Sequence, residues 1–351
     1  MFFQKKEEVT NQKVLLVILD GWGRGKNDLS NPLAEAHLPT IQYLEENYPS
    51  GSLQASGIAI GLPWGEVGNS EVGHLTLGAG KILYQHYPKI TMAIQDGSFF
   101  QNTAFLEAIA HVKKHNSKLH LIGVLTSGTV HAAFEHVLAL AELAKKNNIE
   151  HLYLHPFGDG RDGPPEGGLE LPKQLTAHLK KIGVGKIATT CGRYYGMDRD
   201  GNWDRTKQAY ELITKGTGIY AKTLDEAFQS TYEQKRTDEF IPPYAFLSTA
   251  EENGFVEDND AVILWDFRED SIRQIAAPFA LPNFTSFSAH VPSNLFVVTM
   301  THYDDAFTAH VAFPPEIVAH PLSKVVSDAN KKQLKIAETD KYAHVTNFFN
   351  G

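Results

Sequence analysis

Short continuous apolar runs alternate with amphipathic stretches along most of the chain, and this alternation constrains the fold more than any other feature. The stretches between the runs have the spacing of helices with one apolar face, for example at 133–148 and 171–183. Strands that are apolar without interruption are typical of a parallel sheet covered by helices on both faces. The pattern therefore predicts an α/β fold, with strands at 14–20, 119–126, 151–157, 186–192, 261–267 and 295–301.

Polar and glycine-rich segments follow the predicted strands at their carboxyl ends. Ligands of open α/β sheets bind beyond these ends, so the residues of interest are Asp20, the segment 155–162, Arg193 and Arg268. Residues that several separate loops bring to one edge would form a site. The alternative is that polar residues simply collect in loops, which run over the surface of most proteins.

The composition is that of an ordinary globular protein and limits the possible partners. The 351 residues carry a net charge of −9, whereas a nucleic-acid-binding protein usually shows a basic face. No run approaches the roughly 18 apolar residues of a membrane span, and the charged start lacks a secretory signal. A single cysteine, Cys191, rules out an internal disulfide. We therefore expect a cytoplasmic protein without nucleic-acid or membrane partners, whose clustered arginines suit an anionic small molecule.

Asp20 and Ser70 are the candidates for metal binding and nucleophilic chemistry. Asp20 ends the first apolar run, where a carboxylate can hold a divalent cation or cap the next turn. Ser70 lies in GEVGNSEVGH at a predicted helix start, where it would either cap the helix or attack a bound phosphate. The absence of a G-x-S-x-G elbow and of a G-x-x-x-x-G-K-[ST] loop argues against acyl transfer and nucleotide binding. A metal-bound alkoxide with Asp20 as co-ligand remains as the route to activation.

Two loops carry most of the charged candidates. HPFGDGRDGPP at 155–165 places Asp159, Arg161 and Asp162 on one tight turn. Asp162 could accept a proton from a substrate hydroxyl there, or the turn could merely satisfy itself through Asp–Arg pairs. GRYYGMDRDGNWDR at 192–205 adds Arg193 and Arg199, two guanidinium forks that suit a carboxylate or a phosphate.

Four further residues extend this set. Arg268 lies just past a predicted strand, and Arg273 follows five residues later at a different helical angle. His131 follows another strand end and is the best histidine candidate. Lys341 could bridge phosphate oxygens, or it could be merely solvated.

Two segments are candidate crossings between domains. The segment 61–81 is rich in glycine, and a proline pair interrupts HVAFPPEI at 310–317. Two crossings would make one domain discontinuous, with a second domain inserted into it.

Six motifs taken together resemble those of the cofactor-independent (2,3-bisphosphoglycerate-independent) phosphoglycerate mutases, in the alkaline phosphatase superfamily. In chain order they are VLLVILDGWG, GEVGNSEVGH, HPFGDGRDGPP, GRYYGMDRDGNWDR, TMTHYD and ETDKYAHVTNFFNG. The resemblance covers almost the whole chain. It implies a parallel-sheet alkaline-phosphatase-like domain, incomplete here, with an inserted α/β transferase domain that binds substrate. The phosphatase domain would begin with residues 1–84 and resume with residues 313–351, and residues 85–312 would form the inserted substrate-binding transferase domain.

The resemblance also implies an activity and roles for matching residues. The family interconverts 3-phosphoglycerate and 2-phosphoglycerate in glycolysis and gluconeogenesis through a phosphoserine. Ser70 would be that serine and, with Asp20, a metal ligand, while Asp162 would shuttle the hydroxyl proton. The other matching residues would bind substrate, namely His131, Arg161, Arg193, Arg199, Arg268 and Lys341. The resemblance implies two Mn²⁺ ions for the complete enzyme, with Mg²⁺ or Co²⁺ possible, and a monomer.

Three departures from the family pattern bear on function. Ser271 stands where the family has a second arginine, and Ala133 where a histidine is expected, so we expect altered substrate handling. The family's other metal ligands follow HVTNFFNG, whereas the chain ends at Gly351, so we expect an incomplete metal site. Alternative functions are a catalytically incomplete substrate-binding fragment and a related phosphatase or phosphopentomutase, the latter disfavoured by the loops at 155–165 and 192–205.

Overall fold

The computed structural model describes residues 13–247 and 252–351, which form two compact units. Unit 1 contains the described residues up to Ile60 together with Gly65–Leu83 and Val318–Gly351. Unit 2 contains Gly61–Trp64 and Tyr84–Ile317. Unit 1 is therefore discontinuous in sequence, and unit 2 lies largely within its interruption. The functional roles expected for these segments stay predictions.

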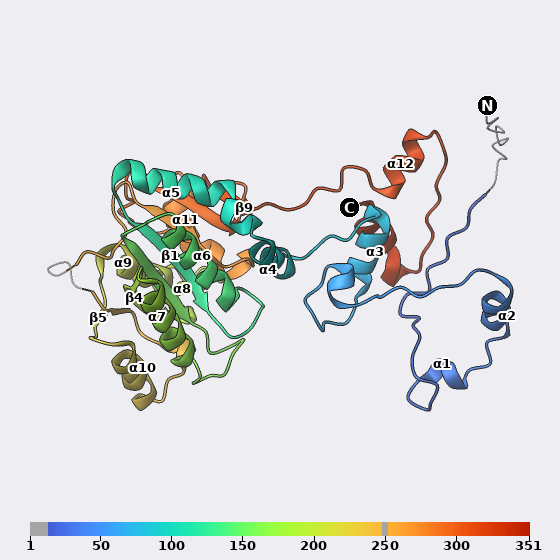
Figure 1. Cartoon of the computed structure of the whole chain (residues 1–351), viewed down its shortest axis with the longest axis horizontal. Helices are drawn as coiled ribbons and strands as arrows, with labels where there is room; N and C mark the ends of the chain where they lie inside the picture. Colours follow the sequence, from blue (N-terminus) through green and yellow to red (C-terminus); the bar gives the residue numbers. More distant parts are fainter. Residues whose placement is uncertain (1–12, 248–251) are drawn as a thin grey trace. The chain divides into compact units, whose positions relative to one another are not determined.

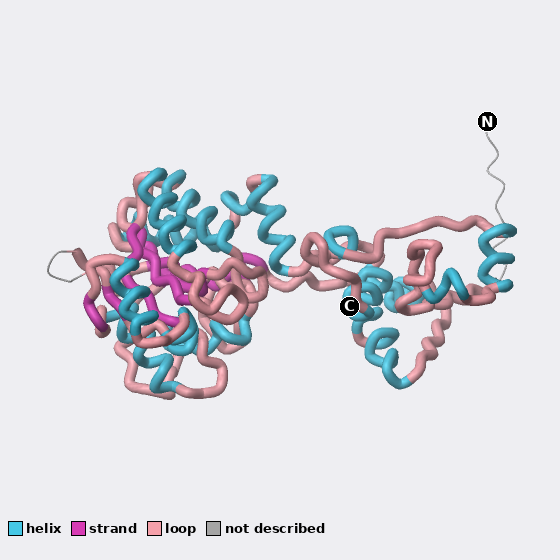
Figure 2. The backbone as a smooth tube through the Cα atoms, turned by 90° about the horizontal axis from the view of Figure 1, so that it is seen from below, coloured by secondary structure: helices cyan, strands magenta, loops and turns pink. Residues whose placement is uncertain are grey.

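Unit 2 is built around a nine-stranded sheet with strand order β5-β6-β4-β2-β1-β7-β8-β9, in which β3 also pairs with β2. All pairs are parallel except β4 with β6. Figure 2 shows these strands as a central layer with helices on both sides, which confirms the predicted α/β class. The strands are β1 (Leu119–Leu125), β2 (Leu152–Gly158), β3 (Lys186–Ile187), β4 (Thr189–Gly192), β5 (Ile219–Tyr220), β6 (Tyr244–Ala245), β7 (Ala261–Leu264), β8 (Phe296–Thr301) and β9 (His310–Phe313).

The helices of unit 2 follow local signals in the sequence. Asn102, for example, caps α5 by accepting hydrogen bonds from the next turn, and Asn116 ends that helix in the left-handed conformation. The α-helices are α4 (His86–Asp96), α5 (Thr103–His115), α6 (Phe134–Lys146), α7 (Glu170–Ile182), α8 (Arg193–Gly196), α9 (Trp203–Lys215), α10 (Leu224–Glu233) and α11 (Glu269–Ala280). Two 3-10 helices, η2 (Ser98–Gln101) and η3 (Asp238–Phe240), complete the set.

The core of unit 2 lies around its central strands. Every residue of β1 and β2 is buried, as expected for strands covered on both faces. The parallel pairing of β1 with β2 and β7 places the carboxyl ends of these strands at one edge of the sheet. The loops that follow β1, β2, β4 and β7 therefore start from a common edge.

Unit 1 has no strand among its described residues. Its helix α3 packs against the chain's carboxyl-terminal elements, which lie beside it in Figure 1. At Gly78 a Cβ would lie 2.0 Å from the carbonyl oxygen of Phe349, so this contact requires glycine. The elements are α1 (Pro32–Glu35), α2 (Pro39–Asn47), η1 (Gly57–Ile60), α3 (Ser70–Ala79), α12 (Leu322–Asp328), η4 (Thr339–Lys341), α13 (Tyr342–Thr346) and η5 (Phe348–Asn350).

The strand predicted at 14–20 is wrong. The run belongs to no strand, and its side chains are largely exposed, with Val14 91% and Leu15 86% accessible. An apolar run forms a strand only where another strand pairs with it, and the described part of unit 1 provides none. Across residues 13–247 and 252–351, no helix is long and apolar enough to cross a membrane.

Candidate functional site

Ser70 is the first residue of α3, but it does not cap that helix. The preceding Asn69 takes that role, since its Oδ1 accepts a hydrogen bond from the Val72 amide at 2.9 Å. The capping function considered for Ser70 is therefore filled by its neighbour. Its hydroxyl is left available for other partners at the positive end of the helix.

Asp20 and Lys341 are those partners. The Ser70 hydroxyl donates a hydrogen bond to Asp20 Oδ2 at 2.5 Å and accepts one from Lys341 Nζ at 2.8 Å. Lys341 also forms an ion pair with Asp20. The hydrogen bond from Lys341, followed by that from Ser70, lowers the pKa of Asp20 and keeps its carboxylate ionised. Unit 1 thus brings together three predicted site residues from segments far apart in the sequence.

The fit of a metal ion to this cluster is limited by the number of donors. Asp20 and Ser70 supply hard oxygen atoms of the kind that divalent cations prefer. Across residues 13–247 and 252–351, however, no three His, Cys, Asp or Glu side chains come together as a metal site. The described residues therefore supply only part of a coordination shell.

The turn after β2 is organised by Asp159. Its Oδ1 accepts from the amide of Asp162 at 3.1 Å and from Arg193 Nη1 at 2.7 Å, and Thr126 donates to its Oδ2 at 2.7 Å. Burial alone would raise the pKa of Asp159, but these hydrogen bonds lower it. Asp159 is 5% exposed, so it fixes the turn from inside.

Arg193, directly after β4, is held on the same edge and is only 6% exposed. The nitrogen that donates to Asp159 also donates to Asp162 Oδ2 at 2.8 Å. Burial opposes its charge, but the two carboxylates raise the pKa of Arg193. His131 Nε2 lies 3.8 Å from Asp162 Oδ2, and the pKa of His131 is lowered by burial and then by the Arg193 charge. His131 is therefore neutral at pH 7, and among the described residues its buried Nδ1 has no hydrogen-bond partner.

Asp270, in the first turn of α11, joins two further arginines. Arg199 Nη1 lies 2.7 Å and Arg268 Nη2 3.1 Å from the same oxygen, Asp270 Oδ2. The other oxygen lies 3.6 Å from His131 Nδ1. The backbone supports this arrangement, because the His131 carbonyl accepts from the amides of Phe267 and Arg268.

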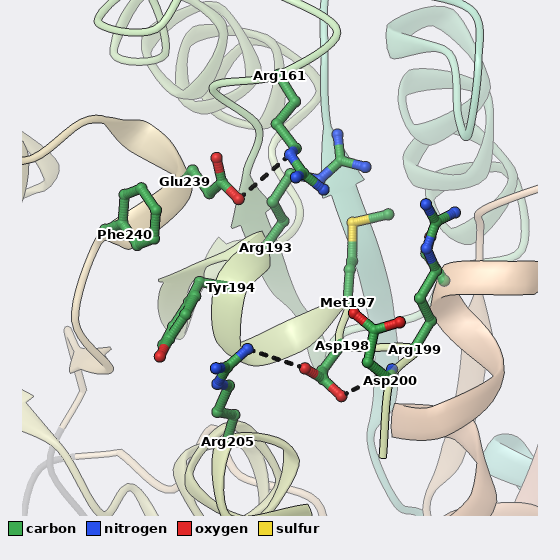
Figure 3. Close-up of a pocket in the computed structure, with 11 residues that line it drawn as sticks. Arg161, Arg193, Tyr194, Met197, Asp198, Arg199, Asp200, Arg205, Glu239 and Phe240 are labelled. Carbon is green, nitrogen blue, oxygen red and sulfur yellow. Dashed lines mark hydrogen bonds and ion pairs between the residues drawn. The ribbon is translucent and has the colours of Figure 1, made fainter. Parts of the chain in front are cut away.

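A cavity of about 320 Å³ lies among these loops, and most of its polar lining is charged. Figure 3 shows Arg161 and Arg193 on one side of it, with Arg161 directed toward Glu239. Arg205 lies on another side, 4.0 Å from the Tyr194 ring centroid and paired with Asp198. The lining residues are Arg161, Arg193, Tyr194, Met197, Asp198, Arg199, Asp200, Arg205, Glu239, Phe240 and Ser271.

Two of the positions that depart from the family pattern can now be located. Ser271 is 2% exposed, and its hydroxyl donates to Asp270 Oδ1 at 3.3 Å. Arg273 is not among the residues that line the cavity, and its Nε donates to the Tyr303 carbonyl at 2.8 Å. Ala133 is buried just before α6.

Sequence reasoning missed the carboxylates that hold Arg161, Arg199 and Arg268. Asp270 had a usable signal, because it lies two residues after Arg268 in the helix-start segment FREDS. Glu239 had none, since it lies 78 residues beyond its partner Arg161, in a short 3-10 helix. Unit 2 thus gathers the predicted His131, Arg161, Asp162, Arg193, Arg199 and Arg268, whereas Asp20, Ser70 and Lys341 lie in unit 1.

Comparisons with known proteins agree on one family. A family model described as the BPG-independent PGAM N-terminus matches residues 90–305. The 2,3-bisphosphoglycerate-independent phosphoglycerate mutase of Moorella thermoacetica is 42% identical over 342 residues, covering 97% of this chain and 67% of that protein. The 2,3-bisphosphoglycerate-independent phosphoglycerate mutase 1 of Methanosarcina barkeri is 43% identical over 341 residues, covering 96% and 66%.

A solved structure gives a similar result. The chain matches a crystal structure of Leishmania mexicana phosphoglycerate mutase at low cobalt concentration, with a TM-score of 0.66 and 28% identity. The match covers 95% of this chain and 63% of that one. The chain thus spans about two thirds of the length of these relatives.

Proposed function

Because the chain belongs to the 2,3-bisphosphoglycerate-independent phosphoglycerate mutase family, we propose that it interconverts 3-phosphoglycerate and 2-phosphoglycerate through a phosphoserine at Ser70. Unit 1 would carry the phosphoryl acceptor, and unit 2 would bind and orient the phosphoglycerate. In this proposal the phosphoryl group leaves one substrate hydroxyl for Ser70 and returns to the other.

The observation that carries the proposal is the contact of Ser70 with both Asp20 and Lys341. The Asp20 carboxylate accepts the hydrogen bond of the hydroxyl, so it orients the oxygen that would attack phosphorus. The Lys341 ammonium donates to that same oxygen and would stabilise negative charge on it or on an attached phosphoryl group. The amino end of α3 favours an anion at this position as well.

The substrate side of the proposal depends on the arginines of unit 2. Guanidinium groups present paired donors that match carboxylate and phosphoryl oxygens. Arg161 and Arg199 have side chains that are 57% and 49% exposed, so a ligand can reach them. Asp162, which Arg193 holds in place, would take the proton of the substrate hydroxyl whose oxygen attacks the phosphoryl group. Neutral His131 could share that proton.

Metal dependence is a further part of the proposal. Asp20 and Ser70 would be ligands, and a bound divalent cation would favour the ionised serine and neutralise phosphoryl charge. We propose Mn²⁺ as the metal; Mg²⁺ and Co²⁺ are alternatives, and the Leishmania mexicana relative was crystallised with cobalt. Cytoplasmic location and a monomeric state belong to the same proposal.

Phosphorylation of Ser70 provides the direct test. The chain is incubated with 3-phosphoglycerate and Mn²⁺, and mass spectrometry follows phosphate on the peptide that contains Ser70, beside a coupled mutase assay. Ser70→Ala should abolish both signals. Ser56→Ala, a serine change elsewhere in unit 1, should leave both intact. Turnover that survives Ser70→Ala would refute the covalent route.

Phosphoglycerate binding without turnover is a second candidate, favoured by the small number of metal donors among the described residues. It predicts binding of phosphoglycerate by calorimetry, no phosphate on Ser70, and no stoichiometric tight Mn²⁺. Tight binding of two Mn²⁺ ions per chain would eliminate it. A related phosphatase or phosphopentomutase would instead turn over other phosphate esters in the same assay.

A further inference from the structure

One carboxylate oxygen holds two of the arginines assigned to the substrate. Asp270 Oδ2 lies 2.7 Å from Arg199 Nη1 and 3.1 Å from Arg268 Nη2. His131 approaches the other oxygen of the same carboxylate. Asp270 therefore makes, within the protein, the contacts that an anionic ligand would make with these three side chains.

The exposure of these groups shows that the contacts can be exchanged. The Arg199 and Arg268 side chains are 49% and 47% exposed, and that of Asp270 is 31% exposed. Ion pairs in such surroundings are weak and are readily broken by a competing anion. The pairs of Arg193 differ, because its side chain and that of Asp159 are each 6% exposed. The Asp270 carboxylate is thus a replaceable partner in this site.

We propose that Asp270 is an internal competitor for the ligand's anionic group and sets the affinity of the Arg199–Arg268 pair for it. A tethered carboxylate acts at a high effective concentration, so an incoming anion has to displace it before it gains both arginines. The identification of phosphoglycerate as the ligand that bears this anionic group rests on the proposed function. The competition itself concerns any small anion, including inorganic phosphate.

A purely positioning role for Asp270 predicts the opposite result. If its carboxylate served to hold Arg199 and Arg268 in their binding geometry, its loss would release two flexible side chains and weaken anion binding. If it competes, its loss frees both guanidinium groups and strengthens binding. The sign of the change in Kd therefore separates the two roles.

The test compares Asp270→Asn with Asp200→Asn, which makes the same chemical change in the same unit. Asp200 lines the cavity, and in the described part of the chain its carboxylate makes no ion pair. Calorimetry on the full chain measures Kd for 3-phosphoglycerate and for inorganic phosphate, and circular dichroism verifies folding. We expect the Kd of Asp270→Asn to be about 3- to 10-fold lower than that of Asp200→Asn for both anions, since two exposed ion pairs are removed.

The outcomes distinguish the competition from the proposed function. Equal or weaker binding by Asp270→Asn, or no binding of either anion by any variant, would overturn the competition. Tighter phosphate binding by Asp270→Asn, with no phosphoglycerate binding in any variant, would support the competition and overturn the proposed function. Tighter binding of both anions supports the two together.

Discussion

Asp266→Asn should change how the stability of unit 2 depends on pH, because Asp266 is a fully buried acid. The residue follows β7, and its Oδ1 accepts a hydrogen bond from the Val124 amide at 2.9 Å. Its Oδ2 is buried and finds no hydrogen-bond partner in the part of the chain that the structure describes. Burial raises the pKa of Asp266 well above its ordinary value, so the fold favours the protonated form of this side chain.

The sign and the slope follow from proton linkage. The stability that the neutral acid provides is fully present below the unfolded pKa near 3.8, and it is lost as pH rises toward the folded pKa. Within that pH range, the unfolding free energy of the parent, the unsubstituted protein, falls by about 1.4 kcal/mol per pH unit relative to that of a variant whose side chain cannot ionise. Between pH 5 and pH 7, the unfolding free energy of Asp266→Asn should therefore rise by up to about 2.7 kcal/mol relative to that of the parent.

The prediction concerns how the stability difference between Asp266→Asn and the parent changes with pH. Its absolute value also contains the cost of the asparagine amide, which leaves a buried donor unpaired. That cost is about 1–3 kcal/mol, but it does not vary with pH. Urea unfolding at several pH values, followed by the fluorescence of the fully buried Trp265, measures the difference in unfolding free energy. A gain of 2.7 kcal/mol corresponds to roughly 5 to 10 °C in Tm for a unit of this size.

A matched Asp→Asn control has a pKa shift of the opposite sign. Asp96 lies at the exposed end of α4, where a hydrogen bond from Ser98 lowers its pKa. Asp96→Asn should therefore show no gain in relative stability as pH rises. If Asp266→Asn and the parent instead gave parallel stability curves from pH 5 to pH 7.5, Asp266 would not be protonated in the fold, and the reasoning would be refuted.

Three other substitutions test separate parts of the structure. Gly78→Ala should destabilise unit 1 by about 1–3 kcal/mol through the clash with Phe349, seen as faster amide exchange in α3; unchanged exchange would contradict the close packing. Asp159→Asn should cost about 3 kcal/mol in urea unfolding, because it leaves the Arg193 charge buried with one carboxylate fewer; a loss below 0.5 kcal/mol would count against that role. Lys341→Met should slow Ser70 phosphorylation about 100-fold in a mass-spectrometric time course, and an unchanged rate would remove the ammonium from the mechanism.

The sheet of unit 2 was predictable because its strands are continuous apolar runs. β1, β2 and β8 lie within one residue of the predicted ranges. The run at 186–192 instead divides into β3 and β4, and the run at 14–20 forms no strand. Apolar sequence shows that a segment would be stable in a buried sheet, but it does not show which strand will pair with it.

The sequence predicted which residues belong to the site better than it predicted which carboxylate pairs with each arginine. Because β1, β2, β4 and β7 are joined through parallel neighbours, residues after their carboxyl ends were expected at one edge, and His131, Asp162, Arg193 and Arg268 lie there. The partner of each arginine depends on where other loops pass. No local pattern in the sequence records the approach of Glu239 to Arg161, and the nearness of Asp270 to Arg268 in the sequence does not reveal its pair with Arg199.

This pairing explains how a chain with a net charge of −9 can hold a cluster of arginines before any ligand binds. Each arginine of the cavity has a carboxylate partner, which reduces the repulsion among them, namely Arg161 with Glu239, Arg193 with Asp159 and Asp162, Arg199 with Asp270, and Arg205 with Asp198. A ligand therefore gains only the difference between its own ion pairs and those it replaces. Since exposure decides which pairs can be replaced, ligand binding should exchange the partners of Arg161 and Arg199 and leave that of the buried Arg193 in place.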